Sequence, residues 1–145
     1  MAAFEPYVKG LLAETPEAQV PLLTTSLQAK PDYDEARLAL AKANGVALGA
    51  HPGLPDLVGF GRRNMDVTLE EIKDFVTVQI GALQAVAALQ GARLQHVKPH
   101  GALYNMAVKN PAIWDAVAEV MAKLDERLIL FVLAGPDRRE LEAIG

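Results

Sequence analysis

The chain has 145 residues, of which 51% are hydrophobic and 22% charged, and its formal net charge is -4. This length and composition fit one folded domain and exclude disorder as its main state. The acidic balance, with no run of lysine and arginine, argues against a nucleic-acid partner. The chain has no cysteine, which excludes disulfides and makes the reducing cytoplasm the expected location. No apolar run of membrane-spanning length or signal-peptide pattern is found, so no membrane partner is expected.

Residues 1–29 form a variable N-terminal segment with the weakest pattern. Its candidate elements are a helix at 7–12 and a strand within 20–28. After it, residues 34–43 are rich in helix-forming alanine and leucine, and the pair Asn44-Gly45 favours a left-handed stop. The short apolar run VALGA at 46–50 then predicts a buried strand.

A glycine- and proline-rich loop over 51–66 separates this strand from a long helix. Thr68 and Glu71 have the Thr-x-x-Glu spacing of a capping box, which predicts that the helix begins there. Apolar side chains then recur every three or four residues, and Gly91 ends the pattern. These apolar positions are Leu69, Ile72, Val76, Ile80, Leu83 and Ala87.

The second half of the chain repeats this order. LQHVK at 94–98 is a strand candidate, and 99–109 is expected to be its loop. Asn110 is expected to cap a helix that begins at Pro111, a favoured first-turn residue. The last two expected elements are a strand at 128–134 and a helix within 135–145.

Strands and helices thus alternate after the N-terminal segment. This order predicts an α/β fold with a parallel sheet, either closed as a (β/α) barrel or open and doubly wound. We expect residues 1–145 to form a single domain.

All three histidines of the chain lie at or just after the end of a predicted strand. These are His51, His96 and His100, and parallel α/β folds place their sites at this end of the sheet. Because side chains alternate along a strand, His96, Lys98 and His100 are expected to share one face. A single histidine is most often a structural residue, but the convergence of three favours a functional site.

The loop after the first strand adds charged candidates. Arg62 and Arg63 could clamp a carboxylate or phosphate, or form a solvated pair. Asp56 could orient a histidine or act as a base, although a turn-forming aspartate is the favoured interpretation. A loop of this length in a compact unit is usually functional.

Three further residues near the second strand have two interpretations each. Lys98 is expected to be partly desolvated and paired with an acid, with an unusual base as the alternative. Tyr104 and Asn105 could donate hydrogen bonds to a substrate or satisfy the loop backbone. No phosphate-binding motif is present, so nothing supports ATP binding by this chain alone.

Three segments resemble a known family. They are GVALGAHPGLPDLVGFGRRNMD at 45–66, QIGALQAVAALQGARLQHVKPHGALYNMA at 79–107 and LAG at 133–135, and they closely resemble the LamB/YcsF family, the A subunits of 5-oxoprolinase. The resemblance extends over roughly 22–145. It implies a (β/α) barrel of the glycosidase and deacetylase type. It also implies a role in ATP-dependent opening of 5-oxoproline to glutamate, together with subunits B and C.

The resemblance carries candidate roles to individual residues. The catalytic candidates are His51, Asp56, His96, Lys98 and His100, and the substrate-binding candidates are Arg62, Arg63, Tyr104 and Asn105. An arginine suits the substrate carboxylate, Lys98 and His100 suit an oxyanion, and a histidine with Asp56 suits general base catalysis. The family's Asp-Leu-Asn-x-Asp strand and Gly-Phe-His-Ala-Gly-Asp loop have no counterpart here, and the chain stops before a later family motif, so an incomplete barrel is expected.

Two other classes of function stay open. One is a truncated, non-catalytic barrel module whose open sheet edges pair with a second copy, which would give a homo-oligomer. The other is a deacetylase-like amide hydrolase that depends on a divalent metal. In that case His51, His96 and His100 are the candidate ligands.

Overall fold

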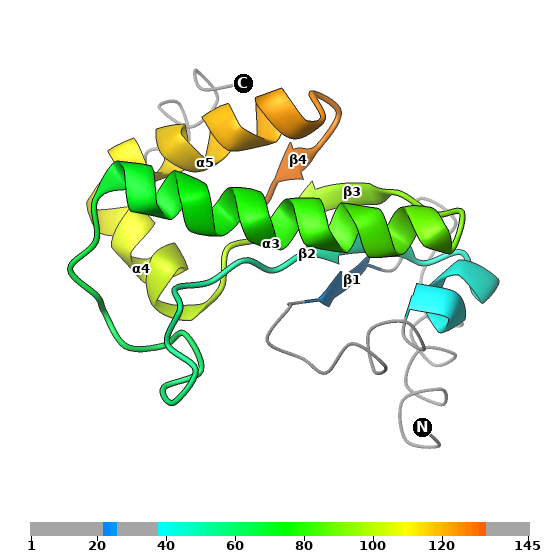
Figure 1. Cartoon of the computed structure of the whole chain (residues 1–145), viewed down its shortest axis with the longest axis horizontal. Helices are drawn as coiled ribbons and strands as arrows, with labels where there is room; N and C mark the ends of the chain where they lie inside the picture. The colour runs from blue at the N-terminus through cyan, green and yellow to red at the C-terminus, as the bar shows by residue number, and fades with distance from the viewer. Residues whose placement is uncertain (1–21, 26–37, 133–145) are drawn as a thin grey trace.

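The protein is described by a computed structural model that covers residues 22–25 and 38–132 (Figure 1). The candidate helix at 7–12 and the expected final helix within 135–145 lie outside the described residues. The expected helix at 34–43 is described from Leu38, and residues 38–43 are helical. Gly45 follows with a φ of +65°, which confirms the left-handed stop.

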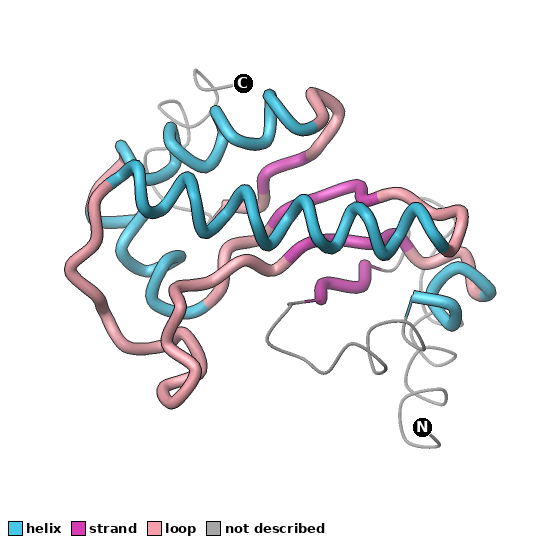
Figure 2. Tube along the Cα trace, in the orientation of Figure 1, coloured by secondary structure: helices cyan, strands magenta, loops and turns pink. Residues whose placement is uncertain are grey.

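Four parallel strands form one sheet in the order of the sequence (Figure 2). They are β1 (Leu22–Thr25), β2 (Ala47–Ala50), β3 (Leu94–Val97) and β4 (Ile129–Leu130). Every neighbouring pair is parallel, and the register pairs Gly49 of β2 with His96 of β3. The α/β class with parallel strands is therefore confirmed, whereas closure into a barrel stays a prediction.

The last strand is shorter than expected. Within the expected strand at 128–134, only Ile129–Leu130 is a strand among the described residues. Phe131 still follows the edge of β3, because its amide donates to the carbonyl of Val97 at 2.9 Å. The apolar run therefore predicted the position of the strand but overestimated its length.

Helix α3 (Leu69–Leu89) covers the sheet and begins as the sequence predicts. The Thr68 side chain accepts from the Glu71 amide, and the Glu71 carboxylate accepts from the Thr68 amide. This is the reciprocal capping box that satisfies two otherwise unpaired amides. Among the described helices, α3 is the one that is long and apolar enough to cross a membrane by length and composition. A core helix meets the same criteria, and one face of α3 is buried against the protein interior.

Residues 101–109 are helical, so the expected loop at 99–109 is wrong. Helix α4 (Gly101–Lys109) buries Ala102, Leu103 and Ala107 on one side. The spacing of these three positions is helical, but the preceding Pro99, His100 and Gly101 are typical of a loop. A helix of two turns that takes its stability from tertiary packing gives only a short periodic signal.

Helix α5 (Ala112–Leu124) starts close to the predicted position but with a different cap. Pro111 already has helical φ and ψ of -55° and -29°. The Asn110 carbonyl, part of the backbone, accepts from the Ile113 amide at 3.0 Å. The expected side-chain cap from Asn110 is therefore replaced by a backbone hydrogen bond.

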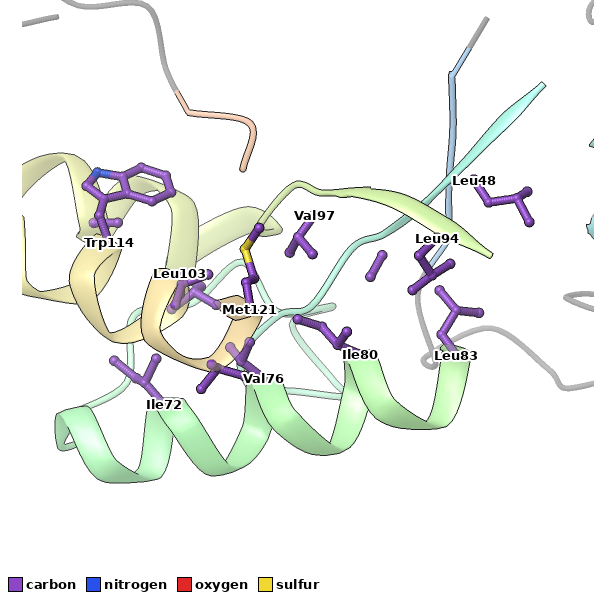
Figure 3. Close-up of a cluster of buried hydrophobic side chains, with 14 of the residues drawn as sticks. Leu48, Ile72, Val76, Ile80, Leu83, Leu94, Val97, Leu103, Trp114 and Met121 are labelled. Atoms are coloured by element: carbon purple, nitrogen blue, oxygen red, sulfur yellow. The ribbon is translucent and has the colours of Figure 1, made fainter. Parts of the chain in front are cut away.

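The core lies between the sheet and the pair α3 and α5, which pack side by side (Figure 1). Figure 3 shows the α3 side chains pointing toward β3, with Met121 of α5 close to Val76 and Trp114 of α5 farther away. All apolar positions predicted on α3 are buried except Leu69, which is at the first turn. The core thus fixes the strands whose carboxyl ends carry the histidines.

Candidate functional site

Two of the predicted site residues meet at the carboxyl ends of β2 and β3. His51 directly follows β2, and His100 stands just before the first residue of α4. Nε2 of His51 lies 2.9 Å from Nδ1 of His100, and the two ring centres are 4.7 Å apart in an edge-to-face arrangement. The prediction that these two histidines converge is confirmed. We call them the histidine pair.

Two main-chain carbonyls orient the histidine pair. His51 Nδ1 donates to the carbonyl of Lys98, and His100 Nε2 donates to the carbonyl of Phe60 at 2.7 Å. These two hydrogen bonds fix the orientation of each ring. Burial is the main cause that lowers the pKa of His51. The hydrogen bond to the Lys98 carbonyl raises this pKa, and the charges of His100 and Lys98 lower it further.

His96 lies in a different environment from the pair. Its side chain is completely buried, and its ring is stacked on Phe131 with 4.6 Å between ring centres. The ring also covers Gly49, where an added Cβ would lie only 1.9 Å from Nε2. Burial lowers the pKa of His96, with smaller contributions from the charges of His51 and Lys98.

The expected single row of His96, Lys98 and His100 is only partly formed. β3 ends at Val97, so strict alternation does not continue through the next residues. His96 is buried, Lys98 is exposed and His100 is half-buried. Side chains alternate between the two faces only within a strand, so the expected common face does not extend beyond Val97.

Lys98 contributes its backbone to the site. Its amide donates to the carbonyl of Ala50 at 2.9 Å, and its carbonyl accepts from His51. The side chain is exposed, and among the described residues it forms no ion pair. The expected desolvated lysine paired with an acid is therefore wrong within the described part of the chain.

Asp56 holds the long loop after β2 together. Its carboxylate accepts from the amide of Gly59 at 2.9 Å and from both the amide and the guanidinium of Arg63. The hydrogen bonds from the Arg63 side chain are the main reason why the pKa of Asp56 lies well below its usual range. The favoured interpretation as a turn-forming aspartate is confirmed. Within residues 38–132, Asp56 has no hydrogen bond to a histidine.

The two arginines of the loop separate in space. Arg63 is bound to Asp56, whereas the guanidinium of Arg62 lies 6.0 Å from the centre of the Phe60 ring. The ring of Phe60 in turn contacts His100 edge-to-face, with 5.2 Å between the centres. Within the described part of the chain, Arg62 is thus the arginine of this loop that is not bound to a carboxylate.

The loop and the start of α4 fit closely against each other (Figure 2). The amide of Ala102 donates to the carbonyl of Gly61 at 2.8 Å. Gly101 has a φ of +55°, and an added Cβ would collide with the same carbonyl. Glycine is required there because of both the backbone conformation and the close approach.

Tyr104 and Asn105 lie on α4 instead of the expected loop. Tyr104 is half-buried against Trp114, with 5.5 Å between ring centres at 89°. Burial raises the pKa of its phenol. Asn105 is exposed. Packing already accounts for the ring of Tyr104, and a substrate contact of either residue stays a prediction.

Sequence reasoning missed residues that shape the site through the backbone or by being small. Gly49 makes room for His96, and a glycine inside a strand is a known signal of close approach. Gln79 of α3 binds both the amide and the carbonyl of Gly53, at 3.0 and 2.8 Å. The sequence does contain a signal for Gln79, because it is a polar residue on the otherwise apolar inner face of a helix.

In the described part of the chain, no three-ligand metal site is found at the pair. The described residues contain no group of three His, Cys, Asp or Glu side chains that could hold a metal ion. A cavity of about 360 Å³ lies at the opposite ends of β2 and β3, where Lys42, Arg93 and Arg127 line it. The side chains of the histidine pair are half-buried, and they lie at the end of the strands where parallel folds place their chemistry.

Comparison with known proteins places these residues in a family. The model of the LamB/YcsF family matches residues 30–143. The 5-oxoprolinase A subunit of Tolumonas auensis is 56% identical over 105 residues, which are 72% of this chain and 42% of that protein. The Bordetella pertussis protein of the same name is 58% identical over 105 residues, with the same coverage of each chain. The chain therefore spans less than half the length of these relatives.

A solved structure gives the same result for the fold. The lactam utilization protein of Thermus thermophilus superposes with a TM-score of 0.74 at 46% sequence identity. The match covers 81% of this chain and 48% of that protein. The strands and helices that carry the histidine pair thus have counterparts in a protein of known structure.

Proposed function

Since this chain belongs to the LamB/YcsF family, we propose that it acts as part of the A subunit of a 5-oxoprolinase. In this role it contributes to the hydrolytic opening of 5-oxoproline, a five-membered lactam, to glutamate. The names of the relatives from Tolumonas auensis and Bordetella pertussis support this proposal. The chain corresponds to 42% of each of these relatives. We therefore assign the activity to the whole assembly and not to this chain alone.

The observation that carries the proposal is the histidine pair at the carboxyl ends of β2 and β3. Opening a lactam requires a positioned substrate, stabilisation of the oxyanion that forms on the carbonyl, and proton transfer. The pair, the exposed Lys98 and Arg62 place imidazole and cationic groups together at one edge of the sheet. Arg62 or Lys98 would bind the substrate carboxylate, and the other would lie near the oxyanion.

ATP and subunits B and C complete the proposal. The sequence contains no phosphate-binding loop, so the nucleotide site is assigned to the assembly and not to this chain. The relatives are named as one of several lettered subunits of 5-oxoprolinase, which supports the existence of partners. ATP hydrolysis would supply the driving force for activating the lactam carbonyl, which is a poor electrophile. The histidine pair and its neighbours would hold the lactam.

Reconstitution with subunits B and C tests the function. We expect glutamate release and ATP hydrolysis that depends on 5-oxoproline, and neither from the chain alone. His100→Ala should lower turnover by about 100-fold or more, the usual contribution of a positioned acid or base. Lys109→Ala, at the exposed end of α4, is the matched control and should keep full turnover. Unchanged turnover of His100→Ala would remove the pair from the reaction.

Strand β4 is an edge strand among the described strands, and its exposed apolar side chain favours a second candidate, a non-catalytic module that associates with another copy. Ile129 of β4 is 51% exposed, and an apolar residue on an edge strand promotes pairing between chains. Size-exclusion chromatography with light scattering separates the two candidates. A dimer that gives no 5-oxoproline-dependent turnover with subunits B and C supports the module, and a monomer contradicts it.

A further inference from the structure

Phe60 lies in the loop after β2 with its backbone in the left-handed region. Its φ is +54°, and among the described residues it is the one non-glycine residue with a positive φ. Glycine takes this conformation at little cost, whereas a bulky side chain is strained there. Both chain neighbours of Phe60 are glycines, Gly59 and Gly61. A third glycine would remove the strain, so the aromatic ring itself calls for an explanation.

The backbone interactions of Phe60 do not require an aromatic side chain. Its carbonyl lies 2.7 Å from Nε2 of His100, and its amide donates to the carbonyl of Leu57 at 3.4 Å. The Asp56 carbonyl closes the same turn by accepting from the Gly61 amide at 2.8 Å. All of these are main-chain groups that glycine also possesses. The turn therefore does not explain the ring.

The protein interior does not explain the ring either. Phe60 is 54% exposed, and within the described ranges it is not part of the hydrophobic core. The ring contacts His100 edge-to-face, with 5.2 Å between ring centres, and the guanidinium of Arg62 lies 6.0 Å from its centre. Both neighbours are candidate site residues. The ring is thus a partly exposed apolar surface at the site.

We propose that the Phe60 ring is the apolar wall of the ligand site and selects a small ring that carries a carboxylate. This inference rests on the proposed function, because 5-oxoproline has this shape. The CH₂ groups of its lactam ring would contact the Phe60 ring. Its carboxylate would accept from Arg62, which forms no ion pair among the described residues. At 6.0 Å, Arg62 is at the limit of a cation–π contact, so binding a carboxylate breaks no strong interaction.

The same wall would distinguish the lactam from its product. Glutamate is an open chain with an ammonium group and two carboxylates, so it has no compact apolar ring to place against Phe60. Its ammonium group would also approach the cationic side chains of Arg62 and Lys98. An aromatic residue at position 60 therefore favours the closed substrate over the opened product.

A protein partner on the loop tip is the competing explanation. Leu57 and Val58 are even more exposed than Phe60, at 80% and 91%, and a partner that covers the tip would bury all three side chains. The contact between the rings of Phe60 and His100 assigns Phe60 to the ligand site instead. Val58 thus supplies a matched control in the same loop.

Calorimetric titration of the chain with 5-oxoproline tests the contact. Phe60→Gly should bind about tenfold more weakly, the effect of leaving roughly 50 Å² of apolar surface in water. Phe60→Tyr keeps the flat ring and should keep the parent affinity, and so should Val58→Ala. Equal affinity of Phe60→Gly and the parent would overturn the proposal. A loss in Val58→Ala as large as that in Phe60→Gly would also overturn it.

Urea unfolding separates ligand recognition from folding. Phe60→Gly relieves the left-handed strain and loses only the contacts of a half-exposed ring, so its midpoint should stay within about 0.5 M of the parent. A larger fall would show that the ring supports the fold, and this result would overturn the proposal.

A second ligand separates the ring contact from the carboxylate contact. Pyrrolidinone, the same lactam without its carboxylate, should lose affinity in Phe60→Gly but not in Arg62→Gln. 5-Oxoproline should lose affinity in both variants. A loss in Phe60→Gly for 5-oxoproline alone would overturn the contact with the lactam ring.

Turnover in the complex with subunits B and C separates this inference from the proposed function. Phe60→Gly should raise the KM for 5-oxoproline by about tenfold, in line with its weaker binding. An unchanged KM with normal turnover would refute the role of Phe60 alone. Binding that depends on Phe60, without glutamate release by the parent complex, would refute the proposed function alone.

Discussion

Replacing Gly49 by alanine should disturb the interior of the protein through one collision. The added Cβ would lie 1.9 Å from Nε2 of His96, and two ring carbons would follow at 2.3 Å. Ordinary contact begins near 3.4 Å, so the ring or the strand would have to move by more than an ångström. The ring is completely buried and stacked on Phe131, which leaves little room for such a shift.

Overpacking of this kind costs about 1–3 kcal/mol, and the closeness of the clash favours the upper half of this range. With a slope of about 1–2 kcal/mol per molar urea, the unfolding midpoint of Gly49→Ala should fall by roughly 1 M or more. Gly81→Ala is the matched control, because nothing lies within 4 Å of its added Cβ in the middle of α3. That variant should be more stable by about 0.5–1 kcal/mol, the helix preference of alanine over glycine.

A double-mutant cycle identifies the collision partner. In the background His96→Ala the space above residue 49 is open, so Gly49→Ala should then cost much less. A free energy of unfolding of Gly49→Ala within about 0.5 kcal/mol of the parent, or an equal cost with and without the His96 ring, would refute the reasoning.

Two further predictions concern the helices that cover the sheet. Glu119 of α5 binds Lys123 and also Lys73 of α3, and these bonds lower its pKa to about 2. Their stabilisation is present above the ordinary pKa of glutamate and is lost as pH falls toward 2, so Glu119→Gln should flatten the acid limb of the stability curve. An acid limb identical to that of the parent would contradict this. Thr68→Ala should cost about 1 kcal/mol in urea unfolding through loss of the capping box with Glu71, and a change below about 0.3 kcal/mol would show that the cap is unimportant.

Features set by neighbours in the chain could be predicted from the sequence. The capping box at Thr68 and the left-handed Gly45 depend on residues within one turn, so their patterns are sufficient. The convergence of His51 and His100 was also predictable, because parallel strands bring their carboxyl ends to one edge whatever the loops do.

Features that depend on partners distant in the chain could not be predicted from the sequence. The choice of Arg63 over Arg62 as the partner of Asp56 depends on the path of the whole loop. The stacking of His96 on Phe131 depends on how the chain continues along β3 directly after β4. Helix α4 was missed because the Pro-His-Gly sequence before it has loop character, while the packing that stabilises the helix comes from distant residues.

The histidine pair is oriented by the carbonyls of Lys98 and Phe60, which every amino acid possesses. Side chains at these two positions can therefore change without removing the acceptors that fix the rings. Substitution at position 98 or 60 would alter the charge and shape offered to a ligand while both carbonyl acceptors remain, although a change at 60 also removes the ring contact with His100. A site built in this way can acquire new substrate preferences by single replacements, and directed evolution should begin at these two positions.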